Sequence, residues 1–316
     1  MLQAIILGSG AGGGVPQWNS AQVSELLSEN GALAGRIKPR TQCGMAVSGN
    51  GKNYFLLNAS PDLRQQILEN SALWPNPALG QRNTPISGVI LTGGEIDAII
   101  GVLTLRESET WDLYASPSTL KELASNRIFS ALNPEFVTRH ALQLDQEFPL
   151  PLKDGTSSGL WLTAFAVESK CPLYAEGADF TEGQKGNKDD TLGLKIRDEQ
   201  GKTLLFIPGC ARITLRIQTL AKEADLLFFD GTLWDNQEMI RRGLSAKTGA
   251  RMGHVSISES DGPLAAFAET PRLKKIFIHI NNSNPVLDQS SAEHQTALKA
   301  GWIVGEDGMR FTLADK

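Results

Sequence analysis

The chain has 316 residues, a formal net charge of −5 and 41% hydrophobic residues. These values are typical of a globular protein that buries a substantial core, and the acidic balance argues against nucleic acid or an anionic membrane surface as a partner. No stretch reaches the ~20 apolar residues that span a bilayer, and the N-terminus lacks the basic region of a signal peptide. We therefore expect a cytoplasmic protein.

Strand and helix signals alternate along the chain. An apolar strand at 4–7 leads into a glycine-rich loop, and strands at 44–48 and 53–58 flank SGNGK, which predicts a hairpin. The segment that follows predicts a helix with Ser60 as N-cap and Pro61 at the first helical position. The remaining strands are expected at 86–91, 112–115, 161–167, 192–197, 203–207, 225–230, 274–279 and 302–304, and the remaining helices at 21–34, from 95 to about 105, and at 117–124, 213–222, 257–268 and 291–299.

This mixture of hairpins and strand–helix units predicts an α/β fold with two sheets and helices outside them. We expect one domain over residues 1–316, with surface excursions at 71–88 and 176–190. The three cysteines, Cys43, Cys171 and Cys210, are far apart and form no C-x-x-C pair. Their spacing argues against a zinc ribbon or a disulfide framework.

Two motifs match enzyme signatures only in their letters. The loop from Gly8 to Gly13 reads GSGAGG, but Pro16 interrupts the helix that a dinucleotide site needs, and no strand-end acid follows. Glycines that allow close packing or ligand approach are the better interpretation. The run from Gly155 to Gly159, GTSSG, precedes a predicted strand and not a helix, so we interpret it as a turn and not as a nucleophile elbow.

The residues with metal-binding chemistry follow predicted strands. His279 ends the apolar strand KKIFIH, and Asp97 and Asp230 also come just after strands, where α/β folds place ligands. His254, in MGHVS, precedes a predicted helix. Carboxylates combined with imidazoles hold Fe, Mn or Zn. For Glu95 the competing interpretation is an acid that complements a helix N-terminus.

The run VILTGGEIDAIIG at 89–101 has the form of a metal-binding loop without most of its ligands. Many metallohydrolases carry HxHxDH in such a loop, whereas this chain has Gly93, Glu95, Asp97 and Ala98 at those positions. The loop therefore poses the question whether the chain still binds a metal.

Motifs along nearly the whole chain resemble one family. They are GSGAGGGVPQWN at the start, FLLNASPDLRQQI at 55–67, the E-I-D of 95–97, FIPGCA, FFDGTLW, KTGARMGH, HINNSNPVLD and a late DGM. Together they resemble the coenzyme PQQ synthesis protein B family, a branch of the metallo-β-lactamase fold. The resemblance implies an αββα sandwich of two mixed sheets, with the metal site where strand ends from both sheets meet.

The resemblance also implies a role in making pyrroloquinoline quinone (PQQ) from a crosslinked Glu–Tyr peptide product. One implied activity is iron-dependent oxygenation of the tyrosine-derived ring. The alternative is a carrier that takes PQQ or its precursor toward the periplasm. The implied partner is a small acidic quinone precursor or PQQ, the implied metal is Fe(II) or Zn, and a homodimer is left open.

Two departures from the family pattern bear on the site. The family typically has cysteines after PQWN that form a small structural zinc site, whereas this chain reads SAQVSE there, so we expect that zinc to be absent. The family typically reads E-I-D-H, and here the histidine is Ala98. Asp97 and His279 carry over as metal ligands, and Glu95 or His254 are the candidates that complete the set.

Two hypotheses follow from this pattern. In the first, the chain is a metal-dependent oxygenase whose catalytic residues are Asp97, His279 and His254 and whose metal ligands are Asp97, His279 and Glu95. In the second, it is a binding protein that kept the pocket without the chemistry. In either case bidentate arginines suit an acidic ligand, and the candidates are Arg64, Arg106 and Arg251. Hydrolysis at two metals is disfavoured, because Gly93 and Ala98 supply no ligands.

Overall fold

The computed structural model describes residues 1–169 and 187–314. Cys171 and most of the excursion expected at 176–190 lie outside the described residues. Across the described part of the chain, no helix combines the length and the apolar character needed to cross a membrane. The first and last described segments, β1 and β14, pair with each other in one sheet.

One mixed sheet has seven strands in the order β14-β1-β2-β3-β4-β5-β6, of which β1 to β6 come from the first half of the chain and β14 from near its C-terminus. The strands β3 to β6 run parallel, whereas β14, β1, β2 and β3 pair antiparallel. The β2–β3 hairpin confirms the turn predicted from SGNGK. The bounds are β1 Leu2–Gly8, β2 Gly44–Ser48, β3 Tyr54–Leu57, β4 Ile86–Ile90, β5 Trp111–Ala115, β6 Val137–Ala141 and β14 Arg310–Leu313.

The other mixed sheet also has seven strands, in the order β13-β12-β11-β10-β9-β8-β7, all from residues 147–304. Its strands β10 to β13 are parallel, and β7 to β10 pair antiparallel. Buried parallel strands read as continuous apolar runs, as LLFF of β11 does. The bounds are β7 Glu147–Pro151, β8 Ser157–Ala166, β9 Leu192–Asp198, β10 Thr203–Ile207, β11 Leu226–Asp230, β12 Lys274–Ile278 and β13 Trp302–Val304.

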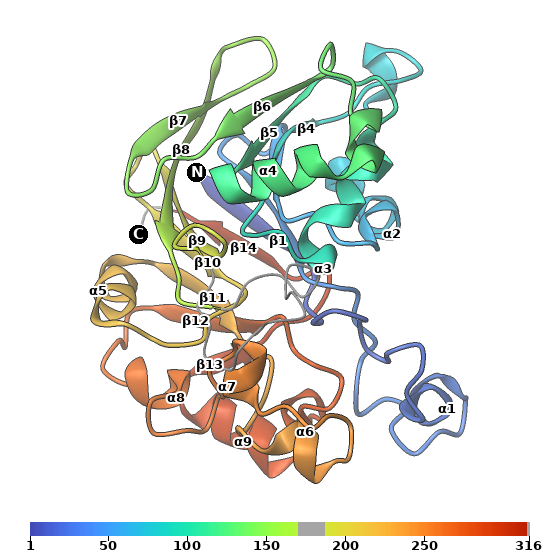
Figure 1. Ribbon diagram of the computed structural model, residues 1–316, viewed down its shortest axis with the longest axis vertical. Coiled ribbons are helices and arrows are strands. Elements are labelled where there is room, and N and C mark those ends of the chain that lie inside the picture. Colours follow the sequence, from blue (N-terminus) through green and yellow to red (C-terminus); the bar gives the residue numbers. More distant parts are fainter. Residues whose placement is uncertain (170–186, 315–316) are drawn as a thin grey trace.

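Helices cover the outer face of each sheet (Figure 1). Those beside the first sheet come from the first half of the chain. Those beside the second sheet come from the second half, apart from the short helix around Leu26, which belongs to the same hydrophobic cluster. The bounds are α1 Gln22–Leu27, α2 Leu63–Glu69, α3 Ile96–Ile99, α4 Pro117–Ser125, α5 Leu215–Glu223, α6 Glu238–Arg241, α7 Gly249–Met252, α8 Pro263–Ala266 and α9 Ala292–Lys299.

Three hydrophobic clusters correspond to the three interfaces between these layers. One lies between the sheets and includes Met45 and Phe228, a second includes Ala221 of α5 and Ala297 of α9, and the third includes Leu63 of α2. Each sheet therefore buries both faces, one against the other sheet and one against helices. This arrangement confirms the predicted αββα sandwich with two mixed sheets.

The structure corrects several predicted boundaries. Ser60 is not the N-cap of α2: the helix begins at Leu63, its N-cap is Asp62, and the Ser60 hydroxyl instead accepts the Asp62 amide in the preceding turn. The helix expected at 257–268 shortens to α8, because residues 258–262 form turns. The helix expected at 21–34 shortens to α1, which stands away from the body of the molecule in Figure 1.

Three strands were not predicted. The strands β6 and β7 have mixed, half-exposed sequences (VTRHA and EFPLP) without a regular apolar pattern. The strand β14 is only four residues long and pairs with β1 at the other end of the chain. The glycine-rich loop after β1 packs as closely as expected, since a Cβ on Gly8 would lie 2.1 Å from the carbonyl oxygen of Gln42.

Candidate metal centre

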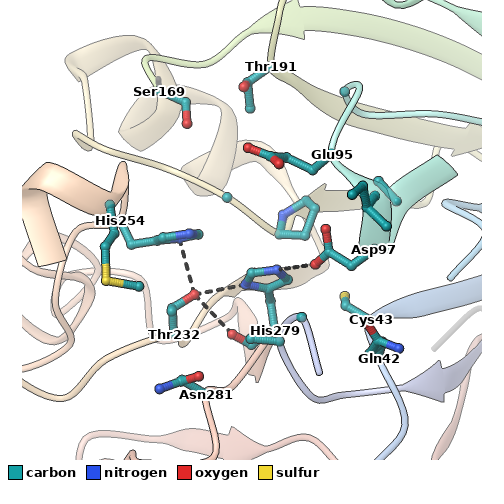
Figure 2. Close-up of a pocket in the computed structure, with 18 of the residues that line it drawn as sticks. Gln42, Cys43, Glu95, Asp97, Ser169, Thr191, Thr232, His254, His279 and Asn281 are labelled. Carbon is teal, nitrogen blue, oxygen red and sulfur yellow. Dashed lines mark hydrogen bonds and ion pairs between the residues drawn. The ribbon is translucent and has the colours of Figure 1, made fainter. Parts of the chain in front are cut away.

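A cavity of about 530 Å³ opens where loops at the ends of both sheets meet (Figure 2). The loop after β4 contributes from one side, and the segments after β11 and β12 contribute from the other. Such a crevice beyond the carboxyl ends of parallel strands is the usual ligand site of α/β sheets. Its lining includes Gly12, Gln42, Cys43, Gly93, Glu95, Asp97, Ala98, Thr191, Lys247, Met252, Thr232, His254, His279 and Asn281.

The loop after β4 brings two carboxylates to the cavity. Glu95 is the N-cap of α3, with an extended backbone (φ −64°, ψ 146°), and Asp97 lies in the first turn of that helix. The Glu95 side chain does not cap the helix, and like that of Asp97 it lines the cavity. The structure thus brings both predicted acids to one cavity.

The same loop explains the two positions without ligands. A Cβ on Gly93 would lie 2.9 Å from the backbone oxygen of Asp190, because Gly93 forms an isolated bridge with Thr191. A histidine at that position would require the 190–191 segment to move. Ala98 lies at the cavity wall and is 7% exposed.

His279 occupies the centre of the site. Its Nε2 lies 3.0 Å from Oδ2 of Asp97, and its Nδ1 lies 2.8 Å from Oγ1 of Thr232. Its backbone is left-handed, with φ +52°. This conformation is uncommon for a residue other than glycine and concentrates at functional sites. It turns the chain at the end of β12 and directs the imidazole into the cavity.

His254 follows α7, whose last turn ends at the left-handed Gly253. The glycine lets the chain reverse, so the imidazole faces His279 with a centroid distance of 5.2 Å and an interplanar angle of 22°. Its Nδ1 lies 2.7 Å from Oδ2 of Asp230. The structure therefore brings His254, His279 and Asp97 together as the sequence analysis expected.

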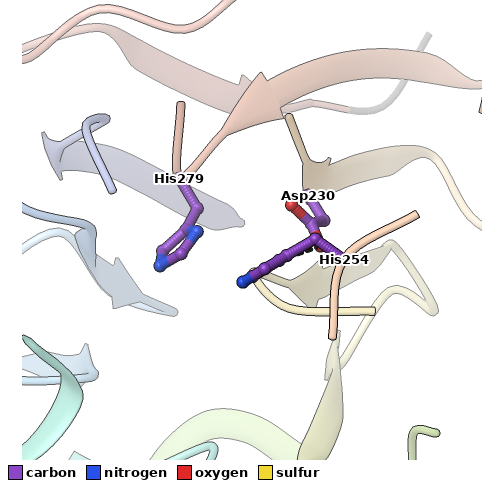
Figure 3. A group of neighbouring side chains, drawn as sticks. All are labelled: Asp230, His254 and His279. Atoms are coloured by element: carbon purple, nitrogen blue, oxygen red, sulfur yellow. Dashed lines mark hydrogen bonds and ion pairs between the residues drawn. The ribbon is translucent and has the colours of Figure 1, made fainter. Parts of the chain in front are cut away.

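Asp230 stands behind the two histidines (Figure 3). It is fully buried, does not line the cavity, and accepts the Cys210 amide at 2.8 Å. Donor atoms of Asp230, His254 and His279 all lie within 4.8 Å of one another. In the described residues this is the one group of His, Cys, Asp or Glu side chains compact enough to hold a metal ion by that measure.

Charge pairing shifts the pKa values of the site. Burial disfavours the charged forms of Asp97 and His279, but the hydrogen bond and attraction between them prevail, so the pKa of Asp97 is lowered and that of His279 is raised. Burial likewise opposes ionisation of Asp230, and the neighbouring His254 nevertheless lowers its pKa. For Cys43, burial and then the Asp97 charge raise the pKa, which keeps the thiol protonated.

The three arginines expected to bind substrate are not among the described residues that line the cavity. Arg64 is exposed on α2, and Arg106 is exposed after α3, where it pairs with Glu107 at 3.3 Å. Arg251 lies on α7, next to Met252, which does line the cavity. The basic residue on the wall is Lys247, in the same KTGARMGH segment.

Sequence reasoning missed Thr232, Lys247 and Asn281. Thr232 and Asn281 each lie two residues beyond a strand-end residue, Asp230 and His279, in segments that were recognised as functional. Lys247 belongs to a basic stretch that is typical of a solvated face. For Thr232 and Asn281, the sequence signal that could have indicated a functional residue was their position just after a strand.

Comparison with known proteins agrees with the observed fold. A family model described as "Beta-lactamase superfamily domain" matches residues 53–280. A diphosphatase of the PhnP family, 17% identical, has the same fold over 98% of this chain and 96% of its own, with a TM-score of 0.64. The chain is thus a member of the β-lactamase superfamily.

Curated relatives narrow the family further. The coenzyme PQQ synthesis protein B of Gluconobacter oxydans is 54% identical over 313 residues, which is 99% of each chain. The protein of that name from Xanthomonas axonopodis is 46% identical over 99% of this chain and 100% of its own. A crystal structure of Zn²⁺-bound PqqB from Methylobacterium extorquens is 40% identical, with a TM-score of 0.89, and covers 98% of this chain and 100% of its own. The chain belongs to the coenzyme PQQ synthesis protein B family.

Proposed function

We propose that this chain acts in PQQ biosynthesis as a metal-dependent oxygenase of the Glu–Tyr-derived precursor. The observation that carries the proposal is the donor set on the cavity wall, in which His254, His279 and Asp97 offer two imidazoles and one carboxylate. Two histidines and one carboxylate, with positions left open, are the ligand set of non-haem Fe(II) oxygenases. The names of its relatives support the pathway.

The residues present fit a metal. Asp97 and His279 face each other, with Oδ2 and Nε2 3.0 Å apart, and both side chains would serve as ligands once the metal displaced the proton between them. His254, whose Nδ1 is engaged by Asp230, has its Nε2 left for the cavity. Glu95 lines the same cavity and is the candidate for a further ligand.

Iron, when bound there, supplies the reaction with O₂ that amino-acid side chains cannot perform. Imidazole also suits zinc, and the relative from Methylobacterium extorquens contains Zn²⁺. The donor set of this chain therefore accommodates either of the two metals expected from the sequence, and the activity distinguishes them because zinc has no redox chemistry.

The chain itself binds and orients the acidic precursor. Lys247 on the cavity wall supplies positive charge for a carboxylate, and Asn281 offers an amide on the same wall. In this assignment Lys247, in place of the candidates Arg64 and Arg106, binds the carboxylate of the precursor. Arg251, one residue from the cavity-lining Met252, is kept as the arginine that extends the same face.

The test is metal binding together with turnover. We expect protein purified without oxygen to bind Fe(II) stoichiometrically and to consume O₂ when given a Glu–Tyr-derived precursor. His279→Ala should abolish both. His294→Ala is the matched control, because His294 lies on α9, its Nδ1 is 2.7 Å from the backbone oxygen of Val286, and it is not among the residues that line the cavity. Precursor or PQQ binding without stoichiometric metal would instead establish the carrier function and overturn the oxygenase.

A further inference from the structure

The hydroxyl of Thr232 connects the two histidines of the site (Figure 2). Oγ1 lies 2.8 Å from Nδ1 of His279 and 3.1 Å from Nδ1 of His254. It also lies 2.6 Å from Oδ1 of Asp230 and 3.0 Å from the backbone oxygen of His279. A hydroxyl has one proton to donate and two lone pairs to accept with. The hydroxyl can therefore donate its proton to only one of these neighbours. Each of the others either donates a hydrogen bond to Thr232 or makes no hydrogen bond with it.

The carboxylate of Asp230 has no free lone pair. Oδ2 accepts the Cys210 amide at 2.8 Å and faces Nδ1 of His254 at 2.7 Å. Oδ1 accepts the Thr232 amide at 3.0 Å and faces the Thr232 hydroxyl at 2.6 Å. An ionised carboxylate offers about four lone-pair sites, and these four neighbours fill them. The side chain is also completely buried and does not line the cavity.

This count of acceptors determines where the protons are. An ionised Asp230 can only accept, so the Thr232 hydroxyl donates to Oδ1, its shortest contact and the one that carries charge. Having used its proton, Thr232 can only accept from Nδ1 of His279. His254 in turn donates its Nδ1 proton to Oδ2 of Asp230. Both rings therefore carry a proton on Nδ1, and Nε2 is the nitrogen that each ring would offer to a metal. In His279 that nitrogen faces Oδ2 of Asp97 at 3.0 Å.

We infer that Asp230 and Thr232 are positioning residues that hold His254 and His279 in the Nδ1–H tautomer, and that Asp230 is not itself a metal ligand. Asp230 acts on His254 directly and on His279 through the Thr232 hydroxyl. The inference rests on the metal site of the proposed function but not on its chemistry. A carboxylate that orients a metal-binding imidazole through its other nitrogen is a general device of metal sites.

The competing arrangement uses Asp230 as a ligand together with the two histidines, since their donor atoms are close enough. In that case Asp230 must release at least one of its four donors. Thr232 would then be free to donate to Nδ1 of His279, whose proton would move to Nε2. The two arrangements thus differ in which nitrogen of His279 is protonated, and this is measurable.

The first experiment is proton–nitrogen correlation NMR of the full chain with nitrogen-15-labelled histidine. His140→Gln and His294→Gln remove the signals of the histidines outside the site and leave those of His254 and His279. We expect Nδ1 of both rings to be protonated in the metal-free protein. On adding Zn²⁺, the Nε2 signals should shift and the Nδ1 protons should persist. A neutral His279 protonated on Nε2, or zinc bound through Nδ1, would overturn the inference.

The two proposals fail separately in this experiment. If zinc and iron do not bind but both rings keep their Nδ1 protons, the metal site is wrong while the positioning of the histidines stands. If metal binds through Nδ1, the metal site stands and the positioning is wrong.

The second experiment removes the Thr232 hydroxyl. We expect Thr232→Val, which keeps the shape of the side chain, to weaken Zn²⁺ binding about 10- to 100-fold. It should shift the His279 Nδ1 signal more than that of His254, whose Nδ1 keeps its shorter contact with Asp230. Thr232→Ser keeps the hydroxyl and should restore both readings. An unchanged His279 signal in a folded Thr232→Val protein would show that the hydroxyl does not hold the ring, which contradicts the inference.

Discussion

The two sides of the cavity contrast in how much of a metal site they contain. The loop after β4 has Gly93 and Ala98 where the metallohydrolase pattern HxHxDH has histidines, and it brings the carboxylates of Glu95 and Asp97 to the cavity. The segments after β11 and β12 keep two imidazoles, and each Nδ1 has a partner. The first side therefore lacks the histidine donors of that pattern. The second side has two histidine donors together with the side chains that orient them.

This contrast teaches that a histidine whose ring is held by hydrogen-bond partners is a stronger sign of function than a match to the residue types of a ligand motif. A fully buried, ionised carboxylate is tolerated only when its oxygens are hydrogen-bonded, and all four acceptor sites of Asp230 are engaged by groups around the two histidines. A left-handed His279 is likewise a conformation that the surrounding structure must enforce. We therefore expect substitutions on the second side to have the larger effects.

The largest effect should come from comparing the two sides directly. His254→Ala removes a donor that Asp230 orients, so Zn²⁺ affinity should fall more than about 100-fold, beyond the range for orienting residues. Glu95→Ala should reduce it less than about 10-fold, since Glu95 is the reserve ligand of the depleted side. Isothermal titration calorimetry of both variants measures the Zn²⁺ affinity. Equal losses of affinity would show that the two sides do not differ in their contribution to metal binding.

The next effect is a gain on the depleted side. Ala98→His should raise Zn²⁺ affinity by about 10-fold or more, because the position lies on the cavity wall near Asp97 and an added imidazole enlarges the donor set. Ala98→Leu is the control of similar bulk without a donor. Affinity that is no higher for the histidine variant than for the leucine variant would mean that position 98 does not face the metal.

A smaller effect concerns the pH dependence of the metal-free protein. The folded pKa of Asp97 is lowered, so its contribution to stability is present above its unfolded pKa of about 4 and is lost as the pH falls. The folded pKa of His279 is raised, so its contribution is complete below about pH 6.5 and is lost as the pH rises through the folded pKa. The pair should stabilise most between these limits.

Thermal unfolding of the metal-free wild type against His279→Gln measures this contribution across pH 3–9, a range that extends about one unit below and more than two units above those unfolded values. The difference in Tm should be greatest near pH 5 and should shrink toward both ends. A difference that does not change with pH would show that the two side chains do not interact as a charged pair.

The smallest effect is expected at Cys43. Its thiol lines the cavity, but burial and the Asp97 charge raise its pKa, and the thiol form is a poor metal ligand. Cys43→Ala should therefore leave the metal stoichiometry unchanged and shift Zn²⁺ affinity less than about 3-fold, well under the range for orienting residues. Loss of stoichiometric metal in this variant would add Cys43 to the donor set.

The sequence predicted most of the fold because its buried strands are continuous apolar runs bounded by turn residues. It missed β6, β7 and β14 because half-exposed or very short strands carry little apolar pattern, and their pairing partners are defined by the assembled sheets. The shortened α8 illustrates the same limit, since turn-forming residues 258–262 interrupt an otherwise helical segment.

The candidate site was predictable where a residue follows a strand, as for Asp97 and His279. The role of Thr232 was not, because a hydroxyl acquires meaning only when Asp230, His254 and His279 converge on it. Arg64 and Arg106 were candidates because of their charge, but both side chains are exposed and neither lines the cavity, and the sequence does not reveal which charges face a cavity.

The contact between Asp97 and His279 also joins the two halves of the sandwich, since one residue follows a strand of the first sheet and the other a strand of the second. A cation held by both residues would link the two sheets across the boundary between them. Ligands that bind only the folded state stabilise it by mass action, by about 2.7 kcal/mol at a concentration of 100 Kd. The melting temperature would then rise with the concentration of free metal. In a cell with little of the metal, the protein would be less stable as well as inactive.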